Sequence, residues 1–471
     1  MSEAIDLPTQ EVLEGAREDT GGLGGHPAGL TTLFFTELWE RFSYYGMRAI
    51  LMLYMVTLPE QGGLGFDTKR AASIYGTYTM SVYLTALPGG LIADKWLGAR
   101  LAVLLGGIII ACGHFTMVVP STNALYAGMA LIAIGTGLLK PNISAMVGGL
   151  YRENDPRRDS GFSIFYMGIN LGAVLAPLVC GYLAQGEGFK RFLAGAGFDP
   201  ATGWHWGFGA AGVGMLLGLA VFLLQRGRLR QAERRVEGRG GVVQEGEAAE
   251  GAGRLTGGDW RRIGAIFIFF LFTILFWAAY EQKGASLNLF ARDLVRTEVF
   301  GLRFPSSWLQ SLTPLYVIML APLFSILWVR MGDRQPSSPA KFAYGMLFIG
   351  LAYLLFMVPA AWLTADGKVS PLWLVGLYFL EVVGEMCLSP VGLSTVTKLS
   401  PAKLVGIMMG VWFLASSLGS KLAGYLSGFF VANDPPTLVR LYGGIALGLL
   451  VATGVLALLI PTLRRMMGRV R

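Results

Sequence analysis

One predicted helix carries charged and tyrosine side chains along a single face. In the segment TELWERFSYYGMRAILMLYMV, such residues recur three or four positions apart: Glu37, Glu40, Arg41, Tyr44, Tyr45 and Arg48. This spacing places them in one stripe of an α-helix. The segment is otherwise apolar enough for a membrane, where ionisable groups are costly and persist if they face each other or a water-filled cavity. The stripe therefore predicts a transport or proton pathway.

A proton-binding cluster is predicted within this stripe. Glu37 and Arg41 are four residues apart, and Glu40 is adjacent to Arg41. Two carboxylates that share one arginine at low dielectric constant titrate as a coupled group, so the cluster can bind and release a proton. Proton binding would free Arg41 to pair with Glu281 in a later segment. The alternative is a static ion cluster that only fixes the helix in place.

The remaining intramembrane charges divide by sign between the two halves of the chain. Arg48 and Lys140 lie in the first half, whereas Glu281 and Glu385 lie in the second. If both halves border one cavity, a zwitterion fits between a positive and a negative wall. We expect Arg48 and Lys140 to bind a carboxylate. Glu385 is expected to bind an ammonium group and to pair with Lys140 when the site is empty; the alternative is a purely structural salt bridge.

Composition places the chain among polytopic membrane proteins. Of its 471 residues, 54% are hydrophobic, 14% are charged and 65 are Gly, whereas soluble domains have about 25% charged residues and about 7% Gly. Small residues let membrane helices approach closely. The net charge of +8 does not indicate a nucleic acid partner, because most basic residues lie in the tails, linker and loops on one side of the predicted membrane spans. No cofactor or metal is expected, since cysteines and histidines stand singly.

Twelve apolar windows are long enough to cross a bilayer. They fall within 31–55, 72–93, 100–119, 122–148, 160–184, 206–225, 260–290, 307–330, 340–362, 371–397, 404–430 and 438–461. We therefore expect an all-α integral membrane protein with twelve transmembrane helices in two six-helix bundles. The expected divisions are a disordered cytoplasmic tail over 1–30, an N-terminal bundle over 31–225, a cytoplasmic linker over 226–259, a C-terminal bundle over 260–461 and a cytoplasmic tail over 462–471.

The basic residues predict the orientation in the membrane. Most of the 38 lysines and arginines fall in the tails, the linker and the loops on the side shared by both termini. By the positive-inside rule both termini are expected in the cytoplasm, with the protein in the inner or plasma membrane. We expect a monomer surrounded by the lipid bilayer.

The two halves resemble weak repeats of one another. Gly135 precedes Pro141 by six residues in the fourth segment, and Gly384 precedes Pro390 by six residues in the tenth. Helices interrupted by Gly and Pro at matching positions of two halves indicate a binding site at their interface.

Several motifs resemble those of the proton-dependent oligopeptide transporter (POT) family of the major facilitator superfamily. The stretch GGLIADKWLGAR matches the superfamily's loop pattern after the second segment. ELWERFSYYGMR resembles the family signature ExxERFxYY, and FYMGINLGAVLAP resembles FYxxINxG. LLKPN, WAAYEQ and GEMCLSPVGLS also stand where the family has them, so the resemblance spans residues 31–461.

The resemblance implies a proton-coupled symporter that imports di- and tripeptides by alternating access of its two bundles. It also implies further substrate-binding side chains, namely Tyr44, Tyr45, Tyr83, Asn170, Trp277, Gln310, Thr313 and Trp412. By residue type alone the aromatic side chains would be assigned to packing or to the membrane interface. Asn170 needs partners either from the substrate or from another helix.

The sequence departs from the family pattern in places. The linker is too polar for the two extra helices that many bacterial members insert there. Thr313 and Ser420 stand where Asn is common, which leaves the exact substrate range open. Thr313 in particular leaves open nitrate or another small organic ion as cargo. Two other classes are alternatives. One is a polytopic membrane enzyme, which would need a nucleophile with a base or a metal cluster, and the other is a sensor that does not transport.

Overall fold

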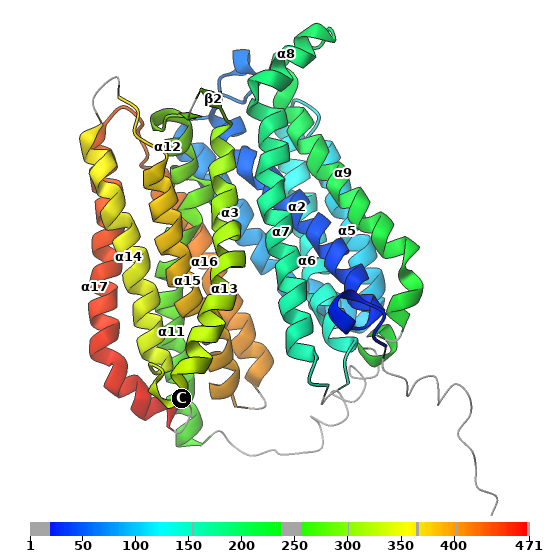
Figure 1. Ribbon diagram of the computed structural model, residues 1–471, viewed down its shortest axis with the longest axis vertical. Coiled ribbons are helices and arrows are strands. Elements are labelled where there is room, and N and C mark those ends of the chain that lie inside the picture. The colour runs from blue at the N-terminus through cyan, green and yellow to red at the C-terminus, as the bar shows by residue number, and fades with distance from the viewer. Residues whose placement is uncertain are drawn as a thin grey trace, which may run out of the picture.

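Long helices account for nearly the whole structure. The computed structural model describes residues 19–152, 155–230, 232–236, 256–299, 301–363, 367–401 and 404–468. Figure 1 shows two groups of long helices side by side, one from each half of the chain. The short helix η1 (Leu23–Gly25), the start of α11 (Gly257–Tyr280) and the end of α17 (Pro435–Met467) lie together at one end, here termed the linker end. The opposite end is termed the outer end.

The first bundle is built around α2, the helix that carries the charged stripe. Its spans are α2 (Ala28–Val56), α3 (Thr68–Leu84) with α4 (Ala86–Ile92) and η3 (Ala93–Leu97), α5 (Ala99–Thr116), α6 (Thr122–Gly149), α7 (Arg158–Gln185) and α9 (Gly203–Leu224). Helix α2 packs mainly on α7 and α9, and it touches the second bundle through η6 and α12.

The second bundle begins with a bent span. Helix α11 continues through η6 (Glu281–Gly284) into α12 (Ser286–Leu294). Gly284 is required at the bend, because a Cβ atom there would overlap the hydroxyl of Tyr75 in α3. The other spans are η7 (Ser306–Ser311) with α13 (Leu312–Met331) and η8 (Gly332–Arg334), α14 (Ser338–Trp362), α15 (Leu372–Leu399), α16 (Val405–Ser427) and α17.

The predicted number of membrane spans agrees with this architecture. Ten of the described spans are long and apolar enough to cross a membrane by length and composition. The other two are α2, which contains two glutamates and two arginines, and the span that is divided between α3 and α4. With these two, the all-α fold of twelve membrane helices in two six-helix bundles is confirmed.

Matching glycines form equivalent helix crossings in the two bundles. A Cβ atom on Gly135 of α6 would lie 2.6 Å from the carbonyl oxygen of Gly106 in α5. A Cβ atom on Gly384 of α15 would lie 2.8 Å from the carbonyl oxygen of Gly345 in α14. Both crossings therefore need a residue without a side chain, as is common where membrane helices pack closely.

The sequence suggested that prolines interrupt these helices, but both helices are continuous. Helix α6 runs through Pro141 and helix α15 runs through Pro390. A proline removes one backbone hydrogen bond, and neighbouring helices in a membrane protein can compensate for that loss. The two halves therefore share the glycine crossing rather than a break in the helix.

Smaller elements lie at both ends. The outer end carries α8 (Glu187–Gly195), η2 (Pro59–Gln61), η4 (Pro200–Thr202) and a hairpin of β1 (Glu298–Val299) and β2 (Leu302–Arg303), none of which was predicted. At the linker end, η5 (Arg226–Leu229) and helical residues 232–236 lie against the first bundle, where Arg235 donates to the Leu150 carbonyl at 3.0 Å. Of the expected tails and linker, residues 1–18, 231, 237–255 and 469–471 lie outside the described residues. Residues 19–30 hold η1 and the start of α2.

Replacing Gly384 with valine should destabilise the second bundle by about 1–3 kcal/mol, because the branched side chain has no room against the backbone of Gly345. The matched control is Gly454→Val in α17, where a Cβ atom meets nothing within 4 Å. Thermal unfolding of the purified variants in detergent measures the difference. Equal Tm values for the two variants would contradict the assignment of Gly384 to a backbone contact.

Candidate functional site

A cavity of about 280 Å³ lies between the two bundles. One side is formed by α2, α3, α6 and α7, and the other by α11, η6, η7, α13 and α15. Twelve of the residues predicted for the site line it: Glu37, Arg41, Tyr45, Arg48, Tyr83, Lys140, Asn170, Trp277, Glu281, Gln310, Thr313 and Glu385. Side chains from helices far apart in the sequence therefore meet at one place.

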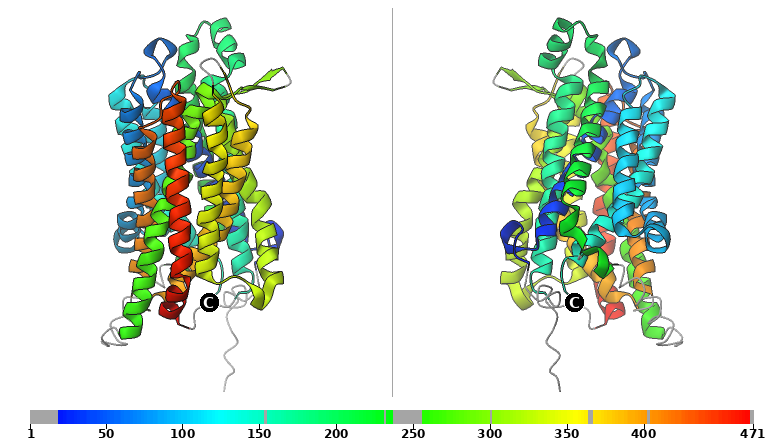
Figure 2. Two further views of the ribbon diagram at one scale, coloured as in Figure 1. Left: turned by 90° about the vertical axis from the view of Figure 1, so that its left-hand side faces the viewer. Right: turned by 90° about the vertical axis from the view of Figure 1, so that its right-hand side faces the viewer.

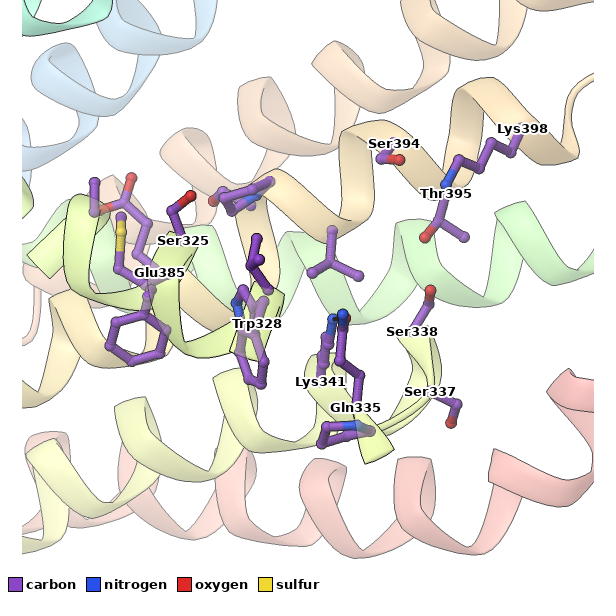
Figure 3. A pocket seen from close by; sticks show the side chains of 18 of the residues that line it. Ser325, Trp328, Gln335, Ser337, Ser338, Lys341, Glu385, Ser394, Thr395 and Lys398 are labelled. Atoms are coloured by element: carbon purple, nitrogen blue, oxygen red, sulfur yellow. Dashed lines mark hydrogen bonds between the residues drawn. The ribbon is translucent and has the colours of Figure 1, made fainter. Parts of the chain in front are cut away.

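A wider cavity of about 780 Å³ adjoins the first and extends toward the linker end. Tyr166 and Glu385 line both cavities. The wider one runs along α13, the start of α14 and α15, and Figure 3 shows Glu385 at one end of it and Lys398 at the other. The central cavity thus continues toward the linker end in this conformation.

The predicted proton-binding cluster is assembled within α2. Arg41 Nε lies 3.1 Å from Glu37 Oε1 and also pairs closely with Glu40. All three side chains are almost completely buried. Within the described part of the chain, Glu37 Oε2, Glu40 Oε1 and Arg41 Nη2 have no hydrogen-bond partner. One guanidinium therefore serves two carboxylates and leaves an oxygen of each available.

Glu281 pairs with Arg48 in this conformation, in which Glu37 and Glu40 hold Arg41. The pairing of Arg41 with Glu281 after proton binding stays a prediction. The Arg48 guanidinium forms a buried ion pair with Glu281 of η6, and its Nε donates to the Tyr75 hydroxyl at 2.5 Å. Arg48 lies about two helical turns farther than Arg41 toward the outer end, at the level where η6 touches α2. The position of η6 along α2 thus decides which arginine meets Glu281.

The expected ion pair between Lys140 and Glu385 is absent among the described contacts. Glu385 instead accepts a hydrogen bond from the Tyr280 hydroxyl. The Lys140 Nζ atom lies 4.5 Å from the centroid of the Tyr83 ring. Both residues line the central cavity, and the cavity itself separates their charges. In this open conformation each charge contacts a tyrosine of its own bundle.

The predicted polar residues differ in how they are engaged. Asn170 donates to the carbonyl of Tyr166 in its own helix at 2.9 Å, and Gln310 donates to the carbonyl of Ala49 in α2 at 3.2 Å. In the part of the chain that is described, the Thr313 hydroxyl and the Trp277 ring nitrogen have no hydrogen-bond partner. These two groups are therefore free to contact a ligand.

Three predicted site residues do not line the cavity. Glu40 lies behind Arg41 and is fully buried. Tyr44 lies beside both arginines of the stripe, with its ring centroid 5.4 Å from the Arg41 guanidinium. Trp412 packs its ring on Phe342 and over Gly392 in the core of the second bundle, so its predicted contact with substrate has no support in this conformation. An aromatic residue in an apolar helix gives no signal that separates a pocket from a core.

The lining residues that sequence reasoning missed include Tyr166, Tyr280 and Lys283. Tyr166 lies one turn before Asn170, so helical spacing could have identified it. Lys283 faces the cavity from η6, with its Nζ 3.3 Å from the centroid of the Tyr280 ring. The rule that intramembrane charges are functional would have selected it. No group of three potential metal ligands occurs among the described residues.

Direct contacts between the bundles concentrate toward the outer end. The Ser311 hydroxyl donates to the Val174 carbonyl at 2.7 Å, and the Trp308 ring nitrogen donates to the Leu178 carbonyl at 3.0 Å. Asn288 of α12 donates to the Ala49 carbonyl at 2.9 Å. The cavity is therefore closed on the outer side while it continues toward the linker end.

The comparisons with known proteins agree with this architecture. The model of the POT family matches residues 100–238 and 251–439. The uncharacterized transporter YclF of Bacillus subtilis is 42% identical, over 95% of this chain and 96% of that protein. The peptide transporter YePEPT of Yersinia enterocolitica is 37% identical, over 94% of this chain and 96% of that protein.

Solved structures show the same fold. A mutant of the peptide transporter POT in complex with alafosfalin matches with a TM-score of 0.85 and 39% identity, over 98% of this chain and 99% of that chain. A POT family transporter in complex with a thioalcohol conjugated peptide matches with a TM-score of 0.81 and 33% identity, over 94% of this chain and 98% of that chain. Family model, relatives and structures all cover most of the sequence. This chain therefore belongs to the POT family of multi-pass membrane transporters.

Proposed function

We propose that this protein is a proton-driven symporter that imports di- and tripeptides. The observation that carries the proposal is the central cavity, where Lys140 of the first bundle and Glu385 of the second line one space without pairing. Relatives named as peptide transporters support the same cargo. No chemical step is needed for this activity, so the protein is not an enzyme.

The peptide lies between the bundles with its two ends on opposite walls. Lys140 holds the terminal carboxylate, and Arg48 joins it when its pair with Glu281 opens. Glu385 holds the terminal ammonium once its hydrogen bond with the Tyr280 hydroxyl has opened. Tyr45, Tyr83 and Trp277 contact side chains of different size, because aromatic faces accept varied apolar groups. Asn170, Gln310 and Thr313 supply neutral polar contacts.

Proton coupling resides in the cluster of Glu37, Glu40 and Arg41. A proton on one carboxylate weakens its hold on Arg41, which leaves the guanidinium to the other carboxylate or to the cavity. Because Glu37 and Arg41 lie in the wall that also carries Lys140, the charge of the cluster acts on a bound carboxylate. Proton binding and peptide binding are thereby linked in one site.

Alternating access follows from the unequal contacts at the two ends. The buried pair of Arg48 and Glu281 joins α2 to η6 on the closed side, and opening that side requires its separation. The linker end corresponds to the cytoplasm, with both termini there, in the inner or plasma membrane. The protein works as a monomer, and residues 31–225 and 260–461 form the two bundles that rock about the cavity.

The cargo is tested by counterflow in liposomes with a labelled dipeptide. Dialanine should exchange, whereas its C-terminally amidated form should compete poorly, because losing one charge-assisted contact costs about 2–5 kcal/mol. Nitrate and small organic ions serve as competing cargoes in the same assay. Exchange that nitrate inhibits and dialanine does not would overturn the peptide assignment.

Coupling is tested by Glu37→Gln and Glu40→Gln. Each variant should lose accumulation driven by an inward proton gradient, since the cluster then lacks one of its two carboxylates, while exchange without a gradient persists. The control is Glu233→Gln, which removes a partly exposed carboxylate paired with Arg100 at 3.2 Å. Normal uphill uptake in both cluster variants would assign the proton to another group.

Closure is tested by Glu281→Gln in a protein that also carries Ser307→Cys. Ser307 is completely buried beside α7 at the outer end. Leaving Arg48 without its partner costs about 3–5 kcal/mol, so the closed form should lose population and thiol labelling at position 307 should increase. Glu298→Gln, in the exposed pair with Arg303, should leave labelling unchanged. Equal labelling in both backgrounds would show that the pair does not hold this end closed.

A further inference from the structure

One lysine in the central cavity has no role in the scheme above. The charges that line or adjoin the cavity form two sets of partners, Arg41 with Glu37 and Glu40, and Arg48 with Glu281. Three charged side chains remain outside these sets: Lys140, Lys283 and Glu385. A zwitterionic peptide needs one cation and one anion, so the cavity wall offers one cation more than such a ligand uses.

Lys283 is that additional cation. It projects from η6 into the cavity with its Nζ over the ring of Tyr280, 3.3 Å from the centroid. No carboxylate lies within 4 Å of this nitrogen in the described residues. An aromatic face stabilises an ammonium group only modestly. An anionic group of a ligand would therefore be a stronger partner for Lys283 than its present one.

The position of Lys283 indicates which part of a peptide it meets. Tyr280 contacts both Lys283 and Glu385, through its ring and its hydroxyl respectively. Lys283 and Glu385 therefore lie at the same end of the cavity. If Glu385 holds the terminal ammonium, the side chain of the first residue starts from the adjacent carbon atom. Its tip is then the ligand group nearest to Lys283.

A second acidic residue lies close by but not in the cavity wall. Glu381 precedes Glu385 by one turn of α15 and is fully buried, and the charge of Lys283 acts on both. Neither carboxylate oxygen of Glu381 has a hydrogen-bond partner in the described part of the chain. Glu381 does not line the cavity, so a ligand that enters meets Lys283 first.

The outer surface carries a matching excess of positive charge. A basin of about 1220 Å³ lies between the end of α7, α8 and the β1–β2 hairpin. Its two glutamates, Glu187 and Glu298, are each paired with a basic residue. Arg191, Arg296 and Lys368 also line it and have no acidic partner within 4 Å among the described residues. Such a field concentrates anionic solutes at the entrance.

We propose that Lys283 is a specificity-determining residue that binds the side-chain carboxylate of an acidic residue at the first position of the peptide. This inference rests on the proposed function and narrows its substrate class to peptides with an amino-terminal Asp or Glu. It accounts for the unpaired cation in the cavity and for the basic basin outside it. The effect depends on position, so an acidic residue at the second position raises the affinity of the peptide less.

Counterflow without a proton gradient tests the inference near neutral pH, where a glutamate side chain is ionised. The probes are Glu-Ala, its neutral isostere Gln-Ala and the isomer Ala-Glu. The wild-type protein should take Glu-Ala at a half-saturating concentration roughly tenfold below that of Gln-Ala, as expected for one charged hydrogen bond. Ala-Glu, with the same net charge as Glu-Ala, controls for general electrostatic attraction.

Lys283→Gln should remove the preference for Glu-Ala while Gln-Ala exchange continues, and Lys283→Arg should retain most of it. The matched control is Lys69→Gln, which removes an exposed lysine near the start of α3.

Equal half-saturating concentrations of Glu-Ala and Gln-Ala for the wild-type protein would overturn the inference without any variant. The inference would also be overturned if Lys283→Gln and Glu381→Gln each reduced the exchange of Glu-Ala and Gln-Ala equally. Lys283 would then act by neutralising Glu381 and not by binding the ligand. If the wild type exchanges none of the three peptides, the proposed function itself fails.

Discussion

The buried ion pair between Arg48 and Glu281 is the contact on which the rest of the site depends. Neither charge can remain alone in this environment, because the cost of desolvation is repaid only by a well-placed partner. Glu281 must therefore leave the path of α11 and reach α2, which requires the bend at η6. The bend in turn requires Gly284, since any side chain there would displace Tyr75 and its hydrogen bond to Arg48. One electrostatic constraint thus fixes a helix geometry and a residue type.

The two ends of the cavity satisfy their charges in different ways. On the closed side an arginine meets a carboxylate directly, whereas on the open side Lys140 lies over Tyr83 and Glu385 accepts from Tyr280. A tyrosine is a neutral partner, so a ligand can replace it without leaving an opposite charge unpaired. A direct ion pair is costly to separate for that same reason. The open side therefore has tyrosine contacts that a ligand can replace, and the closed side has an ion pair that resists separation. Both features are consistent with one transport cycle.

Much of the fold could be predicted from the sequence because membranes limit the choices. A bilayer admits helices of about 20 apolar residues, so the spans could be placed from composition, and helical spacing placed the stripe of α2 on one face. The same spacing assembled Glu37, Glu40 and Arg41 correctly. The outer helix α8 and the β1–β2 hairpin were missed, since short polar loops carry no such constraint.

The features of the site that the sequence could not predict have a common physical origin. Arg41 and Arg48 lie on one face of α2, and spacing alone cannot tell which of them is level with η6. Residues two apart on a regular helix point to different faces, so Glu281 and Lys283 did not suggest a shared cavity. The break at η6 turns both toward it. A chain can therefore reveal which charges enter the membrane while the depth and local winding of its helices decide which charges meet. In this protein that winding leaves Lys283 exposed to a ligand.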